Sequence, residues 1–110
     1  MELTGAQKFK AINDRHENIK NCKGEIMLPV ACLTHNYEDS DGKLHCVLVI
    51  LNGKDKKFYK TEVAAFIEKF KAYWESFGEL PDEEKPEIVI NPRISKKGNE
   101  YANFDLVDAD

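Results

Sequence analysis

Hydrophobic and polar positions alternate along the last quarter of the chain, over residues 86–107. A period of two is typical of β-strands, and Lys96-Lys97-Gly98 divides the pattern as a three-residue hairpin loop with Gly98 in the left-handed conformation. With Ser95 opposite Asn99, Arg93 lies opposite Tyr101. The same register predicts one shared apolar face, made of Ile88, Ile90, Ile94, Ala102, Phe104 and Leu106.

Two segments show helical spacing instead. Residues 4–13 begin with Thr4, a candidate N-cap that forms a capping box with Gln7. Residues 61–77 predict a longer helix with Thr61 as N-cap, ended by Gly78. The expected buried stripes are Leu3, Ala6, Phe9 and Ile12 in the first helix, and Val63, Phe66, Ile67, Phe70, Trp74 and Phe77 in the second.

Three strands are expected between these helices, over residues 25–37, 44–51 and 56–60. Turn signals at Asp41-Gly42 and Asn52-Gly53 separate them. Pro29 has no donor for a ladder bond, so it must lie at an edge, a bend or a bulge. The nearly continuous apolar run of residues 44–51 predicts a central strand covered on both faces.

Three antiparallel strands, a helix and two further strands follow the order of an OB-fold, a small, partly open five-stranded barrel that binds oligonucleotides. We therefore predict an α+β, mainly β chain with one OB-like domain over residues 1–110. The helix between the third and fourth strands would plug one end of the barrel. The alternative is an α+β sandwich in which the same elements form an open sheet under one helix.

Composition describes a soluble globular protein, with 42% hydrophobic and 33% charged residues. The net charge of −4 argues against a general polyanion binder, but a local patch matters more than the total. Lysines gather at residues 54–60 and 96–97. Acidic side chains gather at residues 38–41 and 79–84, and at Asp105, Asp108 and Asp110 near the end.

Cys22, Cys32 and Cys46 make an odd count without a paired spacing, so we expect free thiols and a reducing compartment. Cys32 and Cys46 fall in apolar strands, where a thiol behaves as a small buried hydrophobe. The start of the chain does not resemble a signal peptide, and the longest apolar run, residues 46–51, is too short to span a membrane. We expect a cytoplasmic protein.

Several short motifs resemble those of the small single-stranded-DNA-binding proteins of tailed phages and mobile elements of Gram-positive bacteria. They lie at residues 4–10, 41–43, 59–63 and 95–101, and the Ser-Lys-Lys-Gly-Asn turn is the most specific. The resemblance implies an OB-like, non-catalytic protein that coats single-stranded DNA during replication or recombination in a bacterial host cell. The acidic net charge departs from this expectation.

Sequence-tolerant binding of single strands needs cations along the phosphates and flat rings that stack on bases. The third strand and the closing hairpin supply both. Of Phe58 and Tyr59, we expect Tyr59 to be exposed, because its hydroxyl tolerates water. Tyr37 lies opposite His45 in the first hairpin. The candidate site comprises Tyr37, Lys54, Lys56, Lys57, Tyr59, Lys60, Arg93, Lys96, Lys97 and Tyr101.

The sequence does not favour an enzyme, a metal site or a cofactor. Cys32 and His35 point to opposite faces of one strand, as do His45 and Cys46. The alternative function is a protein-interaction module, in which the acidic surface meets a basic partner or mimics DNA to inhibit a nucleic-acid enzyme. The edge strands of a small open barrel can also pair between subunits, so a homo-oligomer stays open.

Overall fold

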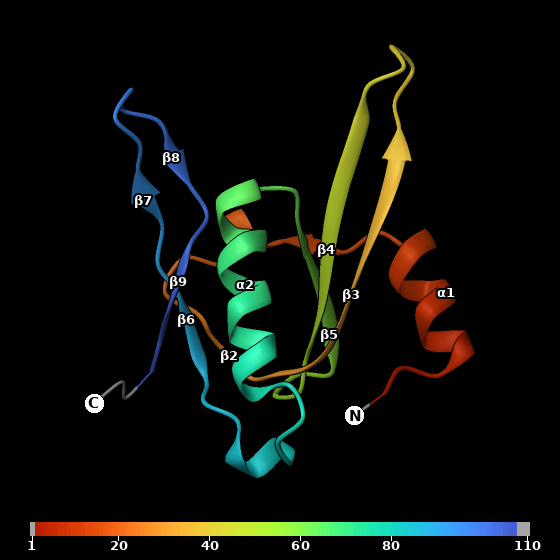
Figure 1. The fold of residues 1–110 in the computed structure, drawn as a ribbon, viewed down its shortest axis with the longest axis vertical. Coiled ribbons are helices and arrows are strands. Elements are labelled where there is room, and N and C mark those ends of the chain that lie inside the picture. Colours follow the sequence, from red (N-terminus) through yellow and green to blue (C-terminus); the bar gives the residue numbers. More distant parts are fainter. Residues whose placement is uncertain (1, 108–110) are drawn as a thin grey trace.

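The computed structural model describes residues 2–107, which form three sheets and two α-helices (Figure 1). The sheets have the orders β1-β5-β4-β3, β2-β6-β9 and β7-β8. Along the chain the elements are α1 (Gly5–Asn13), β1 (Glu17–Asn18), the 3-10 helix η1 (Ile19–Asn21), β2 (Ile26–Met27), β3 (Pro29–Glu38), β4 (Leu44–Asn52), β5 (Lys57–Thr61), α2 (Ala64–Phe77), the 3-10 helix η2 (Asp82–Glu84), β6 (Ile88–Ile90), β7 (Arg93–Ile94), β8 (Glu100–Tyr101) and β9 (Phe104–Leu106).

The predicted five-stranded OB-like barrel is wrong, because the described strands form separate open sheets rather than one closed sheet. The expected first strand is divided into β2 and β3, which join different sheets. Counted from β2, helix α2 therefore follows the fourth strand and not the third. The arrangement is nearer to the alternative of open sheets packed against one helix.

The expected strand divides at Leu28, next to Pro29. The register between β3 and β4 shifts between Pro29 and Ala31, so this proline lies at an irregularity, as predicted. Strand β4 is central, between β3 and β5, as predicted. Its residues 47–51 are buried on both faces of the sheet, whereas Leu44 and Cys46, at its start on the projecting hairpin, are exposed, so the expected cover holds for only part of residues 44–51.

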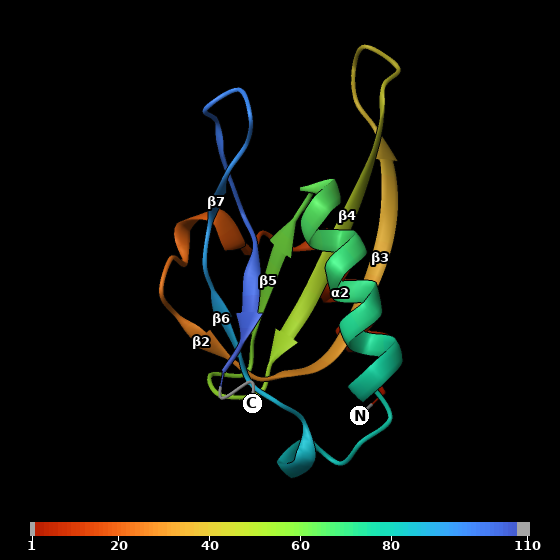
Figure 2. The ribbon, with the colours of Figure 1, turned by 60° about the vertical axis from the view of Figure 1, so that its left-hand side comes forward.

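The main core lies between helix α2 and the two larger sheets. Buried Phe66 and Phe70 of α2 pack with Ile50 of β4, Ile88 of β6 and Phe104 of β9. On the opposite face of the four-stranded sheet, α1 contributes buried Ala11 to a smaller cluster with residues of β4. The four-stranded sheet is therefore covered by a helix on each face (Figures 1 and 2).

Each α-helix differs from the prediction in one respect: α1 in the residues that it buries, and α2 in the residue at which it begins. Thr4 and Gln7 form the predicted capping box of α1. Its expected buried stripe is wrong, however, since Phe9 is 68% exposed and Ile12 is also exposed. Helix α2 begins at Ala64 with Val63 as N-cap, because Thr61 is the last residue of β5 and is fully buried there.

The closing hairpin keeps its predicted register but not its continuity. Arg93 pairs with Tyr101, and the Ser95 N–H donates a hydrogen bond to the Asn99 carbonyl. Gly98 has a φ of 84°, which is the predicted left-handed conformation. The strands are interrupted around Pro92, so β6 and β9 stay in the core while β7 and β8 extend beyond it. Ile94 is consequently 72% exposed, and its expected place on the buried face is wrong.

Two hairpins project from the end of the molecule where α2 begins (Figures 1 and 2). We call them the β3–β4 arm, which ends in the turn at residues 39–43, and the β7–β8 arm, which ends at residues 95–99. The turn between β4 and β5 lies at the opposite end of the molecule (Figures 1 and 2). This separation decides which of the predicted site residues can act together.

The three cysteines are free, as expected. Cys22 is buried and Cys32 is half-buried, and burial raises their pKa values to about 12 and about 11. Cys46 is exposed, so its expected burial is wrong. Neither helix of the described residues has the length and apolar character needed to cross a membrane.

Candidate nucleic-acid interface

A shallow cavity of about 390 Å³ lies between the end of α1 and the adjacent face of the four-stranded sheet. Tyr37 of β3 and Lys60 of β5 line it, together with His16 and His35. The two strands place these side chains there because β5 turns Tyr59 and Thr61 to the core and Lys60 to the opposite face. Aromatic rings and a cation thus meet at the base of the β3–β4 arm.

Tyr37 is held by a network of polar contacts. Its ring is stacked on that of His45, with centroids 4.8 Å apart and an interplanar angle of 9°. Its hydroxyl donates to the Glu62 carboxylate at 3.2 Å. Because Tyr37 is still 41% exposed, one aromatic surface is fixed in orientation and partly accessible to a base.

His45 links the arm to the start of α2. Its Nε2 lies 2.7 Å from Asp39 Oδ2 and its Nδ1 lies 3.0 Å from Glu62 Oε1. The hydrogen bond to Asp39 is the main cause that raises the pKa of His45, and the same bond lowers the pKa of Asp39. The charged imidazolium is therefore favoured at this junction.

Lys60 is connected to the other arm through a short neighbouring segment. It pairs in register with Asn18 of β1, and η1 follows directly with Lys20. Lys20 and Tyr101 line a second shallow cavity of about 220 Å³, together with Pro92 and Glu100. The pairing of β1 with β5 thus places the segment that carries Lys20 between Lys60 and the β7–β8 arm.

Lys96 and Lys97 are exposed at the end of the β7–β8 arm. Arg93 is less available, because its Nη2 donates to Asp105 Oδ1 at 2.6 Å and its Nη1 donates to the Asn91 carbonyl. Hydrogen bonds from Asn91 and Arg93 lower the pKa of Asp105, so its carboxylate stays ionised. The ion pair of Arg93 and Asp105 then has no net charge. Arg93 therefore connects the start of the β7–β8 arm to β9, and its charge is already matched by that of Asp105.

The structure does not place Tyr59 on the surface. It is 8% exposed, packs in the main core and donates its hydroxyl hydrogen to Asp55. Phe58 is the residue on the opposite face, where its ring lies 5.2 Å from that of His16. The expectation that Tyr59 is the exposed ring is therefore wrong.

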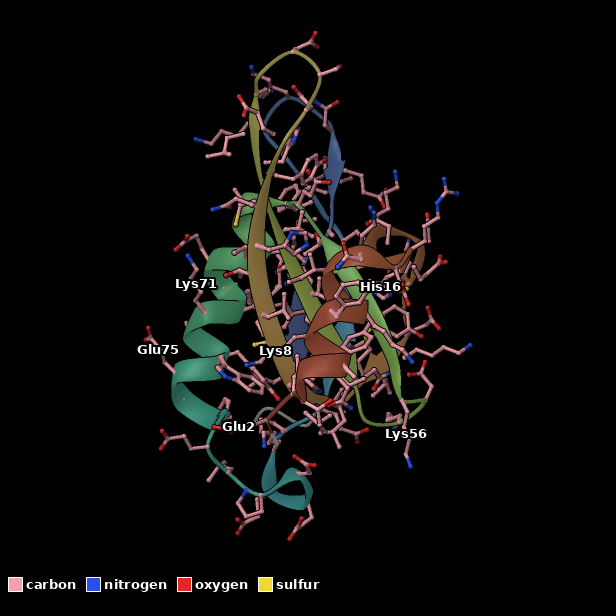
Figure 3. The ribbon with its side chains drawn as sticks, turned by 90° about the vertical axis from the view of Figure 1, so that its right-hand side faces the viewer. Glu2, Lys8, His16, Lys56, Lys71 and Glu75 are labelled. Atoms are coloured by element: carbon pink, nitrogen blue, oxygen red, sulfur yellow. The ribbon has the colours of Figure 1, made fainter. Side chains whose placement is uncertain are left out.

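The lysines of the β4–β5 turn lie away from the other candidates. Lys54 forms an ion pair with Glu87. Lys56 in this turn and Lys57 at the start of β5 are exposed, and Figure 3 shows Lys56 at the end of the molecule opposite the arms. Lys54, Lys56 and Lys57 are therefore separated from Lys96 and Lys97, and Lys60 is the member of the first predicted lysine cluster that lies on the side of the arms.

We name the connected surface the inter-arm strip. Its cations and rings lie on β3, β5, η1 and β8 and at the end of the β7–β8 arm. Sequence reasoning did not place Lys20 and His16 in the site, because only the pairing of β1 with β5 brings the segment after α1 beside Lys60. It also missed His35 of β3, which lines the same cavity as Tyr37 and Lys60. The strip comprises Tyr37, Lys60, Lys20, Tyr101, Lys96 and Lys97.

The acidic clusters are partly neutralised. Asp105 contacts Arg93 and Lys69, and Asp82 contacts Lys85, whose side chain is fully buried. Asp108 and Asp110 lie outside the described residues. Within residues 2–107, no group of three His, Cys, Asp or Glu side chains is arranged to hold a metal ion.

No family model, no curated protein and no solved structure matches this chain.

Proposed function

We propose that this chain is a non-catalytic single-stranded-DNA-binding protein, and that the inter-arm strip is its binding surface. The observation that carries the proposal is the pairing of β1 with β5, which sets the segment that carries Lys20 between Lys60 and Tyr101. Lys60 of β5 pairs with Asn18 of β1, and Lys20 of η1, two residues later, lines the same cavity as Tyr101. The resemblance of the turn at residues 95–99 to single-stranded-DNA-binding proteins of phages supports the same function.

The strip offers both kinds of contact that single strands require. Lys20, Lys60, Lys96 and Lys97 can follow a phosphate backbone from one arm to the other. Tyr37 and Tyr101 can each stack on a base, which contributes on the order of 1–3 kcal/mol. Because these contacts read neither base edges nor a duplex groove, we expect weak dependence on base sequence.

Location and partners follow from the same function. We propose that the protein acts in the cytoplasm of a bacterial host during replication or recombination, where replication or recombination proteins and further copies of the chain would be its partners. The three free thiols support a reducing compartment. A protein-interaction module is the weaker candidate, because Asp82 and Asp105 are held by Lys85, Arg93 and Lys69.

Fluorescence anisotropy of a labelled dT20 oligonucleotide across a salt series tests the proposal. Four lysine contacts predict that log K falls against log salt with a slope of about −3, at about 0.7 per phosphate contact. Tyr101→Ala should weaken binding without changing that slope, because stacking releases no counterions.

A matched duplex is the control for this experiment. The bases of a duplex are paired and stacked on one another and cannot stack on Tyr37 and Tyr101, so the duplex should bind more weakly than dT20. Absence of dT20 binding at low salt, or tighter binding of the duplex, would contradict the proposed function.

A further inference from the structure

The four-stranded sheet ends in an unpaired edge. Strand β3 is its last member, and no strand of residues 2–107 pairs with its outer side. The Asp39 N–H bonds to the Lys43 carbonyl at the start of the β3–β4 ladder. The alternation of an antiparallel ladder then directs the backbone groups of Cys32, Thr34 and Asn36 away from β4. This edge has free donors and acceptors for another strand.

A groove of about 830 Å³ runs along this edge. Three successive residues, Cys32, Leu33 and Thr34, line it. Cys32 and Thr34 share the side of β3 that faces α2, where Leu48 and Phe70 also line the groove, and Leu33 between them belongs to the other side, so the groove reaches from the α2 side of β3 to its edge. It is therefore placed where an added strand would lie.

Two helices stand beside the free edge. Figure 3 shows β3 between α2, with Lys71 and Glu75, and α1, with Lys8. Buried Leu48 and Phe70 and half-buried Trp74 also line the groove. The groove thus offers an apolar floor to alternate side chains of an extended segment.

The charges of the groove are unequal along its length. Figure 3 shows Lys71 nearer the arms than Glu75 and Glu2, and Glu79, which also lines the groove, follows the end of α2. A segment antiparallel to β3 would run from the arms toward that acidic part. Its carboxyl-terminal end is therefore the end at which a basic side chain is favoured.

We propose that this groove binds an extended segment of a partner protein, which adds to β3 as an antiparallel strand. The segment places an apolar side chain against Trp74 and a lysine or arginine near Glu75 and Glu79. Backbone hydrogen bonds supply affinity and the two side-chain positions supply specificity, as in other cases of strand addition. The acidic lining favours such a peptide over nucleic acid, and the proposal is independent of the inter-arm strip.

A random dodecapeptide library displayed on phage, selected on the full chain, is the probe. We expect enriched peptides with alternating apolar residues and a basic residue toward the carboxyl end. Their affinities are then measured as synthetic peptides on the full chain and two variants. Thr34→Pro removes an outward N–H without touching the β3–β4 ladder, and should weaken binding at least tenfold. Thr34→Val keeps the edge and is the matched control.

Charge reversal provides a second readout. Glu75→Lys with Glu79→Lys should weaken binding of the basic peptides about tenfold or more, while circular dichroism stays unchanged. Excess dT20 should not displace the peptide. Selection of no peptide that depends on Thr34, or displacement by dT20, would overturn the proposal. So would a wild-type dimer that Thr34→Pro converts to monomer, because a second copy would then occupy the edge.

Discussion

At the scale of single residues, Tyr59 is buried in the main core and Phe58 lies on the opposite face of the sheet, the reverse of the prediction. A strand sends Phe58 and Tyr59 to opposite faces, but the sequence alone does not say which face meets the larger core. Tyr59 packs with the α2 side and binds Asp55 through its hydroxyl. That hydrogen bond is the main cause that raises its pKa. A buried tyrosine can thus satisfy its hydroxyl without being exposed.

Tyr59→Phe removes this donor and leaves Asp55 without it. We expect a loss of about 0.5–1.5 kcal/mol in the free energy of unfolding, measured by urea denaturation. Affinity for dT20 should not change, because the ring does not reach the inter-arm strip. A loss of affinity with unchanged stability would instead return Tyr59 to the binding surface.

At the scale of elements, His45 connects the β3–β4 arm to the start of α2 through Asp39 and Glu62. A folded pKa above the unfolded value means that His45 stabilises the fold fully below about pH 6.5 and loses this effect as pH rises through the folded pKa. Asp39 has a lowered pKa, so its contribution is lost only as pH falls through that lowered value. Both contributions are present between about pH 4 and 6.5.

Stability should therefore fall as pH rises above about 6.5, and His45→Gln should flatten this part of the profile. Urea denaturation at a series of pH values measures it. His35→Gln is the matched control, because His35 has no carboxylate partner within residues 2–107. An unchanged profile in His45→Gln would show that the two ion pairs do not stabilise the arm.

Local patterns predicted several elements well. The capping box of Thr4, the central place of β4 and the pairing of Arg93 with Tyr101 depend on neighbours within a few residues or on one turn. The barrel failed because closure depends on contacts between distant strands. The break at Leu28 sends β2 to a different sheet from β3, and apolar alternation alone does not reveal it.

The candidate site was predicted in the same uneven way. Lys96 and Lys97 follow from a recognisable turn, whereas Lys20 joins them only through the parallel pairing of β1 and β5. Ile94 satisfies the alternating pattern but extends beyond the core, where it stays exposed. Alternation of apolar and polar residues shows which face of a strand a residue occupies. It does not show whether another sheet or a helix covers that face.

At the scale of the whole molecule, positive charge is divided between two ends. The β7–β8 arm carries Lys96 and Lys97, and the β4–β5 turn carries Lys56 and Lys57 at the opposite end (Figures 1 and 3). The two pairs have the same chemistry and are both exposed. They differ in whether they adjoin the inter-arm strip, so they form a matched comparison.

The most direct test of the strip is therefore the salt dependence of dT20 binding for two double variants. Lys96→Ala with Lys97→Ala should weaken binding and reduce the magnitude of the slope of log K against log salt by about 1.4, at about 0.7 for each phosphate that is no longer neutralised. Lys56→Ala with Lys57→Ala should leave the slope as in the wild type. The reverse result, with the slope reduced only by the β4–β5 turn variant, would contradict the inter-arm strip as the binding surface.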